Sequence, residues 1–248
     1  MDDPGEFFDV AAPFYDARSG DEMPDVAFYR TLAREAGGPA LELGVGTGRV
    51  YLELLSDGVD VDGIDLSARM LDRLRQKARE CDLDPSVRAA GMTEFEAERT
   101  YDLVYAPARA FNHLTTLADQ RAALQRVYDA LAPDGRFALN TYVPRFETVV
   151  ESYGTPQEER VAADGDPYRI VRTSELVDEV EQLVRLNWEV YRGGALVAER
   201  ETPIALVPKR QFELLFDLVG FADWAVYGGF DREPLDSADQ EMVWVVEK

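Results

Sequence analysis

The apolar positions of the chain follow two spacings, one typical of buried strands and one typical of helices. The apolar runs with the length of strands cover about residues 39–43, 60–64, 86–90, 101–105, 136–142, 223–227 and 241–247. The stretches with helical periodicity cover about residues 25–36, 48–56, 67–80, 119–132 and 209–219. Strands and helices that alternate in this way predict a parallel sheet with helices on both of its faces.

A different pattern occupies residues 168–207, where apolar side chains recur at every second position. The clearest run is Val184, Leu186, Trp188 and Val190. A Gly193-Gly194 pair after this run is typical of a hairpin turn. We therefore expect an antiparallel meander, inserted after the fifth strand and placed to form a lid at the carboxyl ends of the strands. Its arginines could form a solvent face or line a site, and they are Arg172, Arg185 and Arg200.

A glycine-rich turn follows the first strand. Residues 41–48 read Leu-Glu-Leu-Gly-Val-Gly-Thr-Gly, and a helix is expected from Arg49 to Leu55. Glycines let the backbone turn sharply and approach a ligand, while the start of the helix presents unpaired N–H groups. Asp65 stands about 20 residues further on, at the end of the next strand, where a carboxylate can accept both hydroxyls of a ribose. The pairing predicts a nucleoside ligand.

Two ligand classes fit this turn, the nicotinamide or flavin dinucleotides and S-adenosylmethionine (SAM). The dinucleotide pattern G-x-G-x-x-G places its third glycine at position 49, which is Arg49 here, whereas the glycine falls at Gly48. Glu42 also precedes the turn. A carboxylate disfavours an anionic pyrophosphate but is compatible with the ammonium and sulfonium groups of SAM. Charge therefore favours SAM.

Several motifs in the same register resemble those of the class I SAM-dependent methyltransferases. Glu42 to Gly48 has the form E-x-G-x-G-x-G of the first motif. Later segments that look like the second, third and fourth motifs and the turn before the fifth strand are 63–71, 90–92, 101–105 and 131–135. The likeness covers roughly residues 5–145 and is weaker beyond them. Motifs in series are more specific than one glycine loop.

The resemblance implies an α/β fold, a Rossmann-like doubly wound sheet of seven strands with the antiparallel β insertion after the fifth. We expect residues 1–248 to form a single methyltransferase domain. Its parts would be an N-terminal helical lid at 1–38, a SAM-binding core at 39–145, the insertion at 146–207, and a final helix and strands at 208–248. A homodimer through the insertion is one expected assembly.

The resemblance also implies a set of residues that bind SAM, with S-adenosylhomocysteine (SAH) as the product. These residues are Arg18, Glu42, Gly44, Gly46, Gly48, Asp65, Leu66, Met70, Met92 and Ala106. Met70 could equally belong to the core, since methionine at helical spacing often does. The family often has an acidic residue at position 91 to bind the adenine amino group, and Gly91 cannot make that contact.

Three further residues are candidates around the reacting groups. Tyr15 and Arg18 lie in a segment that resembles the lid helix of many such domains, where Tyr15 could close over the methyl group and Arg18 could pair with the SAM carboxylate. His113, the one histidine of the chain, follows the fourth strand and is the candidate for a catalytic or orienting role toward the acceptor. Asn112 and Arg109 beside it are weaker candidates.

Composition narrows the setting of this function. The formal net charge is −22, from 48 acidic and 26 basic residues, which makes nucleic acid a poor partner. The carboxylates are scattered, so a solvated shell suited to a salt-rich cytoplasm explains them better than a funnel for a cationic substrate. We expect a cytoplasmic, halophilic protein without a membrane span or signal peptide. Cys81 is the only cysteine, and no metal site is expected.

The predicted activity is methyl transfer from SAM to a nitrogen or oxygen of a small-molecule acceptor, by direct displacement. The segment after the fourth strand resembles that of small-molecule N- and O-methyltransferases, including those acting on amino sugars and glycine-type amines. Two other functions remain open. One is a non-catalytic SAM-binding regulatory protein, and the other is a nicotinamide-dependent oxidoreductase, which Arg49 and Glu42 disfavour.

Overall fold

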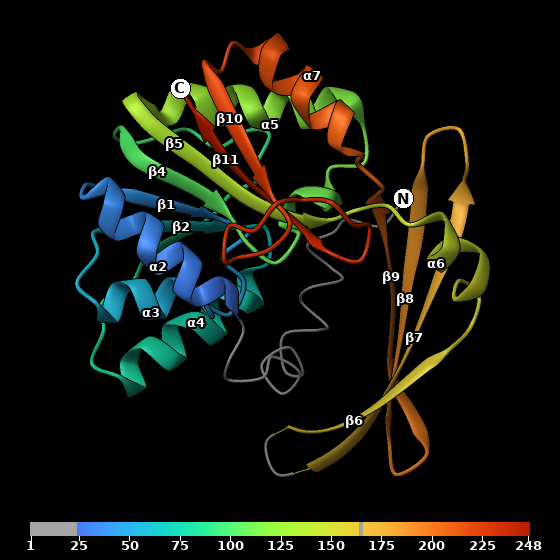
Figure 1. The fold of residues 1–248 in the computed structure, drawn as a ribbon. Helices are drawn as coiled ribbons and strands as arrows, with labels where there is room; N and C mark the ends of the chain where they lie inside the picture. The colour runs from blue at the N-terminus through green and yellow to red at the C-terminus, as the bar shows by residue number, and fades with distance from the viewer. Residues whose placement is uncertain (1–23, 164–165) are drawn as a thin grey trace.

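The computed structural model describes residues 24–163 and 166–248, and its larger sheet has seven strands (Figure 1). The strand order is β10-β11-β5-β4-β1-β2-β3, in which β11 alone pairs antiparallel with both of its neighbours. The strands are β1 (Ala40–Leu43), β2 (Val61–Asp65), β3 (Ser86–Ala89), β4 (Tyr101–Ala106), β5 (Leu131–Tyr142), β10 (Asp223–Tyr227) and β11 (Glu241–Glu247). This arrangement confirms the predicted mixed α/β fold.

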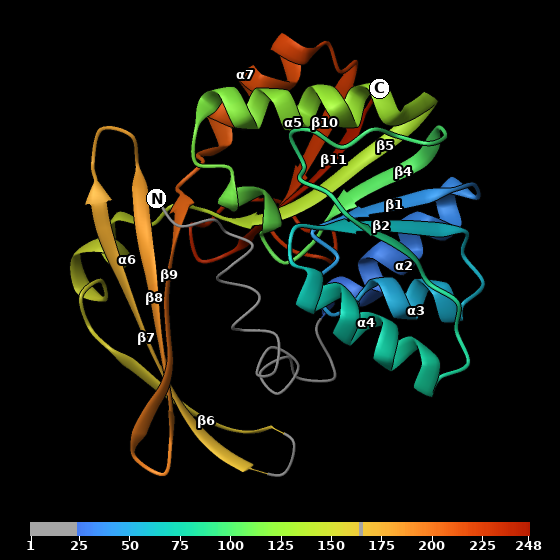
Figure 2. The same ribbon diagram turned by 180° about the vertical axis from the view of Figure 1, so that it is seen from behind.

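Helices cover both faces of this sheet, as the two opposite views show (Figures 1 and 2). One face carries α2 (Pro24–Ala36), α3 (Tyr51–Ser56) and α4 (Ala68–Glu80), and the other carries α5 (Leu117–Ala130) and α7 (Lys209–Val219). Successive residues of a strand point to opposite faces. In β4, Leu103 and Tyr105 accordingly pack with the first group of helices, whereas Val104 and Ala106 pack with the second.

A second sheet of four antiparallel strands lies between β5 and α7 in the chain. Its strands are β6 (Gln157–Ala163), β7 (Asp166–Asp178), β8 (Leu183–Arg192) and β9 (Ala195–Ala205), and α6 (Phe146–Glu151) precedes them. In both views this sheet stands apart from the core sheet, on the side toward which β4 points (Figures 1 and 2). The period-two pattern of residues 168–207 thus predicted an antiparallel sheet correctly.

Some boundaries differ from the predicted ones. The helix expected from Arg49 begins at Tyr51, because Gly48 adopts a positive φ of 86° and the turn continues through residue 50. Strand β5 begins at Leu131, which pairs with Tyr101 before a shift in register; a turn was expected there. Strand β6 and helix α6 were not predicted, because the segment that forms β6 is polar and lacks a period-two pattern.

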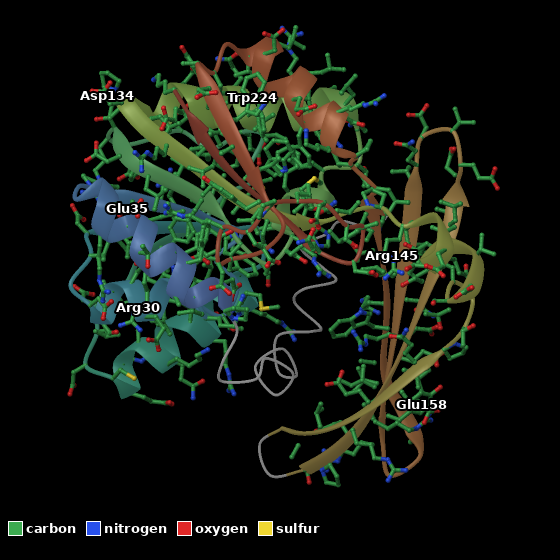
Figure 3. All side chains as sticks on the ribbon, viewed as in Figure 1. Arg30, Glu35, Asp134, Arg145, Glu158 and Trp224 are labelled. Carbon is green, nitrogen blue, oxygen red and sulfur yellow. The ribbon has the colours of Figure 1, made fainter. Side chains whose placement is uncertain are left out.

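Ion pairs lie on the helices and loops around the core sheet and on the second sheet. Figure 3 labels Arg30, Glu35, Arg145 and Glu158, each of which joins such a pair. Paired arginines of this kind offset the self-repulsion of an acidic chain. Within residues 24–163 and 166–248, no helix combines the length and the apolar character that crossing a bilayer requires.

Candidate functional site

The glycine turn after β1 is crowded at one position and open at another. Gly44 has a φ of 70°, and a Cβ there would lie 3.0 Å from the Cβ of Ala110 and 3.2 Å from Cε of Met92. Gly46 has a φ of 54°, and its Cβ would meet nothing nearer than the carbonyl oxygen of Gly44 at 4.0 Å. The turn therefore packs against two neighbouring loops and leaves its Gly46 side accessible, as close approach of a ligand to the backbone requires.

Asp65, at the end of β2, connects this turn to the start of α4. Its Oδ2 accepts a hydrogen bond from the backbone N–H of Gly46 at 2.8 Å, and its Oδ1 accepts one from the N–H of Ser67 at 2.8 Å. Each oxygen of a carboxylate has two acceptor positions, so these bonds are compatible with additional bonds from ribose hydroxyls. The structure thus brings the predicted acid to the glycine turn and gives it a second role in holding that turn.

Glu42 is buried beneath the turn, with 2% of its surface exposed. Burial raises the pKa of Glu42 to about 8, although Tyr105 donates a hydrogen bond to its Oε2 at 2.7 Å, which acts in the opposite direction. The side chain is therefore mostly protonated at neutral pH. Only the ionised form of Glu42 disfavours a pyrophosphate, so the glycine spacing distinguishes the two ligand classes better than the charge of Glu42 does.

Arg49 has a structural role that the sequence did not indicate. Its NH1 and NH2 donate to the two carboxylate oxygens of Asp25 at 2.7 and 2.6 Å, and the Asp25 side chain is only 2% exposed. A two-bond pair of this geometry is among the stronger charge-assisted interactions. It joins the end of the glycine turn to helix α2, which covers the same face of the sheet.

Apolar groups for a flat ring lie beside the turn. Leu66 is 49% exposed, and a Cβ at Gly91 would lie 3.3 Å from its Cδ2. The same Cβ would lie 3.5 Å from Oε1 of Glu94, so a carboxylate lies beside position 91 although the residue there is glycine. The sequence did not indicate Glu94, because it stands three residues after position 91 and its side chain reaches back.

Met92 packs against the turn at Gly44, whereas Met70 and Ala106 lie deeper. Met70 is buried in α4 with 1% of its surface exposed, and Ala106 is fully buried at the end of β4. Contact of these two side chains with a ligand stays a prediction, and their burial gives both of them a packing role.

The loop after β4 leads to a short 3₁₀ helix, η1 (Ala110–His113), that joins the two sheets. Asn112 is buried and donates from Nδ2 to the carbonyl oxygen of Ala205 in β9 at 2.8 Å. Its Oδ1 accepts a hydrogen bond from Oγ1 of Thr141 in β5 at 2.6 Å. Asn112, a weaker candidate in the sequence, therefore has a clear structural function.

His113 ends η1, and its Nδ1 atom is buried. Burial lowers the pKa of His113 to about 4, because a charged imidazolium is poorly solvated there. This differs from the unperturbed pKa of about 6.5 that the sequence suggests. The imidazole is neutral at neutral pH and its nitrogens are weak bases. Tyr15 and Arg18, the other two candidates, lie outside the described residues.

Comparison with known proteins identifies relatives for the region that holds this site. Residues 40–135 match the model of a family described as a methyltransferase domain. A phosphatidylethanolamine N-methyltransferase of Cereibacter sphaeroides is 32% identical over 141 residues, which cover 52% of this chain and 69% of that protein. A protein of Geobacillus sp. (strain WCH70), also named a methyltransferase, is 30% identical over 109 residues, and the match spans only 44% of its length and of this chain.

Solved structures that resemble nearly the whole chain include two methyltransferases. The CcbJ methyltransferase from Streptomyces caelestis is 24% identical, with a TM-score of 0.81, and the match covers 99% of this chain and 98% of that one. KedS8 from Streptoalloteichus sp. ATCC 53650, described as a sugar N-methyltransferase, is 18% identical, with a TM-score of 0.76 and coverage of 100% and 95%. At these identities the likeness shows a shared fold, including the second sheet.

Proposed function

Because the chain belongs to the class I SAM-dependent methyltransferases, we propose that it transfers a methyl group from SAM to a nitrogen or oxygen of a small-molecule acceptor by direct displacement. SAM is the methyl donor of this family and SAH its product. The observation that carries the proposal is the joined pair of Gly46 and Asp65, which sets an open glycine turn beside a carboxylate at the end of β2. These groups fit the amino acid and ribose parts of SAM.

The adenine of SAM would lie between Leu66 and Met92. Leu66 offers an exposed apolar surface beside Gly91, and Met92 lies beside Gly44. In this proposal Glu94 accepts a hydrogen bond from the adenine amino group, because its carboxylate lies over Gly91. Arg18 would bind the carboxylate of SAM, and Tyr15 would close over the reacting methyl group.

The acceptor would bind between η1 and one face of the second sheet. Strand register separates the three candidate arginines: Arg172 and Arg200 both lie opposite Trp188, so the three share a face. Arg185 lies on the other face, where it pairs with Glu175 at 3.0 Å. We assign the face with Trp188 to the acceptor, where Arg172 also pairs with Glu159 at 3.5 Å, and the face with Arg185 to solvent.

SAM, when bound, supplies an electrophilic methyl group on a positively charged sulfur. The residues of the chain then hold the acceptor's lone pair in line with that methyl group and exclude water, which provides most of the catalysis. His113 is neutral at neutral pH and can accept a hydrogen bond from an acceptor N–H or O–H. Its low basicity makes orientation of the acceptor its main role, and removal of a proton a slower second one.

Titration calorimetry with SAM, SAH and NAD tests the donor, and we expect binding of the first two and none of NAD. Turnover with a panel of amino sugars, small amines and phenols tests the acceptor. A protein that binds SAM but methylates no member of a broad panel would match the regulatory alternative. Binding of NAD in preference to SAM would contradict the proposal.

His113→Asn tests the role of the imidazole once an acceptor is found. We expect nearly unchanged SAM affinity and a lower kcat, since an amide retains polarity but alters geometry. Loss of a general base costs about 10²–10⁴ in rate and removes a limb of the pH profile, whereas loss of orientation alone costs less and retains it. Because the pKa is near 4, such a limb belongs near pH 4. Wild-type kcat and pH dependence would exclude both roles.

A further inference from the structure

The loop between β4 and η1 holds two consecutive residues in a backbone conformation that side chains disfavour. Ala108 has a φ of 54° and Arg109 a φ of 63°, and neither is glycine. The left-handed region costs roughly 1–2 kcal/mol for each such residue, so it persists only where the surroundings enforce it. The strain lies immediately before η1 and therefore before His113.

Arg109 makes contacts that help to hold the loop in this conformation. Its Nε donates to Oε1 of Glu241 at 3.0 Å and its NH2 donates to Oε2 at 2.6 Å, while its guanidinium carbon lies 5.3 Å from the ring centroid of Tyr142. Two parallel bonds fix the direction of the guanidinium as well as its distance. The loop after β4 is thus attached to β11 and to the end of β5.

Glu241 is itself held in place by hydrogen bonds that lead to the core. Nδ2 of Asn140 donates to Oε1 of Glu241 at 2.8 Å, and the hydroxyl of Tyr29 donates to Oδ1 of Asn140 at 2.9 Å. Tyr29 is fully buried in α2, and the Glu241 side chain is 18% exposed. The anchor for Arg109 therefore belongs to the rigid core and cannot follow the loop if the loop moves.

We propose that the Arg109 and Glu241 pair is a positioning device that holds the strained loop and thereby sets where His113 meets the acceptor. Arg109 is then a positioning residue that acts through His113. This inference rests on the proposed function, because that function assigns His113 to the acceptor. The pair adds little to global stability, since the Arg109 side chain is 51% exposed and exposed pairs contribute about 1 kcal/mol or less.

The chain contains a matched control at the other end of β4. Arg99 donates two bonds to Asp60, from NH1 at 2.5 Å and NH2 at 2.6 Å, and its guanidinium carbon lies 5.5 Å from the ring centroid of Tyr101. It repeats the forked pair and the aromatic contact of Arg109. Arg99 precedes the first residue of β4, Tyr101, whereas η1 follows the last residue of that strand. Arg99 and His113 therefore lie near opposite ends of β4.

The experiment uses the only histidine of the chain as its reporter. Side-chain NMR of ring-labelled protein gives one imidazole signal, followed from pH 8 to 5.5. In wild type we expect it to stay at the neutral position, because burial keeps the pKa of His113 near 4. In Arg109→Gln and in Glu241→Gln the released loop exposes the ring, and the signal should move toward the protonated position. Arg99→Gln should behave as wild type.

The results separate this inference from the proposed function. An unchanged histidine signal in both Arg109→Gln and Glu241→Gln, in variants that retain the wild-type circular dichroism, would overturn the positioning role. The same shift in Arg99→Gln would also overturn it, because loosening would then be general. SAM titration of the same samples is the second readout, with a change of no more than about threefold expected. Failure of wild type to bind SAM would contradict the proposed function and leave the NMR result standing.

Discussion

Strand β1 of the core sheet is buried along its whole length, whereas β9 of the second sheet is buried only near its end, from Thr202 to Ala205. The core sheet is covered by helices on both faces, whereas the second sheet has only a small apolar cluster around Ile170 on one face, with ion pairs on both faces. The glycine turn proposed to bind SAM is built on the densely packed core sheet. We therefore expect SAM binding to depend on dense packing, and the proposed acceptor surface to depend on fewer contacts.

The largest expected effect comes from opening a cavity in each sheet in turn. Leu41→Ala in β1 and Ile170→Ala in β7 both remove a fully buried side chain, at a cost of about 2–5 kcal/mol. We expect Leu41→Ala to lower global stability in urea and to weaken SAM binding. Ile170→Ala should loosen the second sheet and leave SAM affinity within about twofold. Loss of SAM binding in folded Ile170→Ala would contradict the expectation that SAM binding does not depend on the packing of the second sheet.

Acid should reveal the burial of His113. The folded pKa of about 4 lies below the unfolded pKa of about 6.5, so the unfolded state binds the proton more tightly as pH falls between these values. Folding stability therefore falls over that range, by about 3 kcal/mol for this group, and the loss is complete below pH 4. His113→Gln removes the contribution, so the stability of the variant relative to wild type should rise by that amount from pH 7 to 4. Urea unfolding at several pH values measures it, and a constant difference would contradict the assigned burial.

Asp65→Ala tests the donor site alone. We expect SAM affinity to fall by roughly 1.5–3 kcal/mol, since charged hydrogen bonds to two ribose hydroxyls are lost. The carboxylate also accepts the N–H groups of Gly46 and Ser67, so some loss of stability accompanies it. Asp65→Asn retains one acceptor oxygen, so its SAM affinity should lie between those of wild type and Asp65→Ala. Calorimetry below the unfolding temperature of each variant measures the SAM affinity, and an unchanged affinity would remove Asp65 from the site.

Salt should have the smallest effect and act on both sheets. Raising KCl from dilute to molar concentration screens repulsion among the 48 acidic residues, so the melting temperature should rise by a few degrees. The surface ion pairs are weakened at the same time, which limits the gain. A flat or falling melting temperature would contradict the salt-adapted interpretation and favour an acidic funnel for a cationic substrate.

The order of the core elements could be predicted because buried strands and helices have characteristic patterns of apolar residues. Strands such as 101–106, covered on both faces, appear as continuous apolar runs, and the glycines at 44, 46 and 48 have positive φ as the turn required. Strand β6 was missed because it contains Glu158, Glu159 and Arg160, so its sequence resembles a loop. An edge strand with charged side chains carries little periodicity.

The electrostatics of the site could not be predicted from the sequence. The sequence alone suggests ordinary pKa values for His113 and Glu42. Burial in the folded structure lowers the pKa of His113 and raises the pKa of Glu42. Pairs distant in sequence were equally hidden. The sequence shows that Arg49 disfavours a dinucleotide, but its contact with Asp25 depends on where α2 packs in the fold. The sequence thus predicted the motifs of the candidate site, but not which residues contact each other there or how burial changes their pKa values.

Asn112 has a consequence for how new substrate preferences could arise. Its amide reaches Thr141, where the chain leaves the core sheet, and Ala205, where the chain returns. The points where the chain leaves and re-enters the core sheet therefore both contact the side chain of Asn112. A segment that starts and finishes at neighbouring points can be exchanged for another of different length without stretching the remainder. Grafting the region between these two residues from one relative into another is therefore a direct route to hybrid enzymes that keep one donor and accept different molecules.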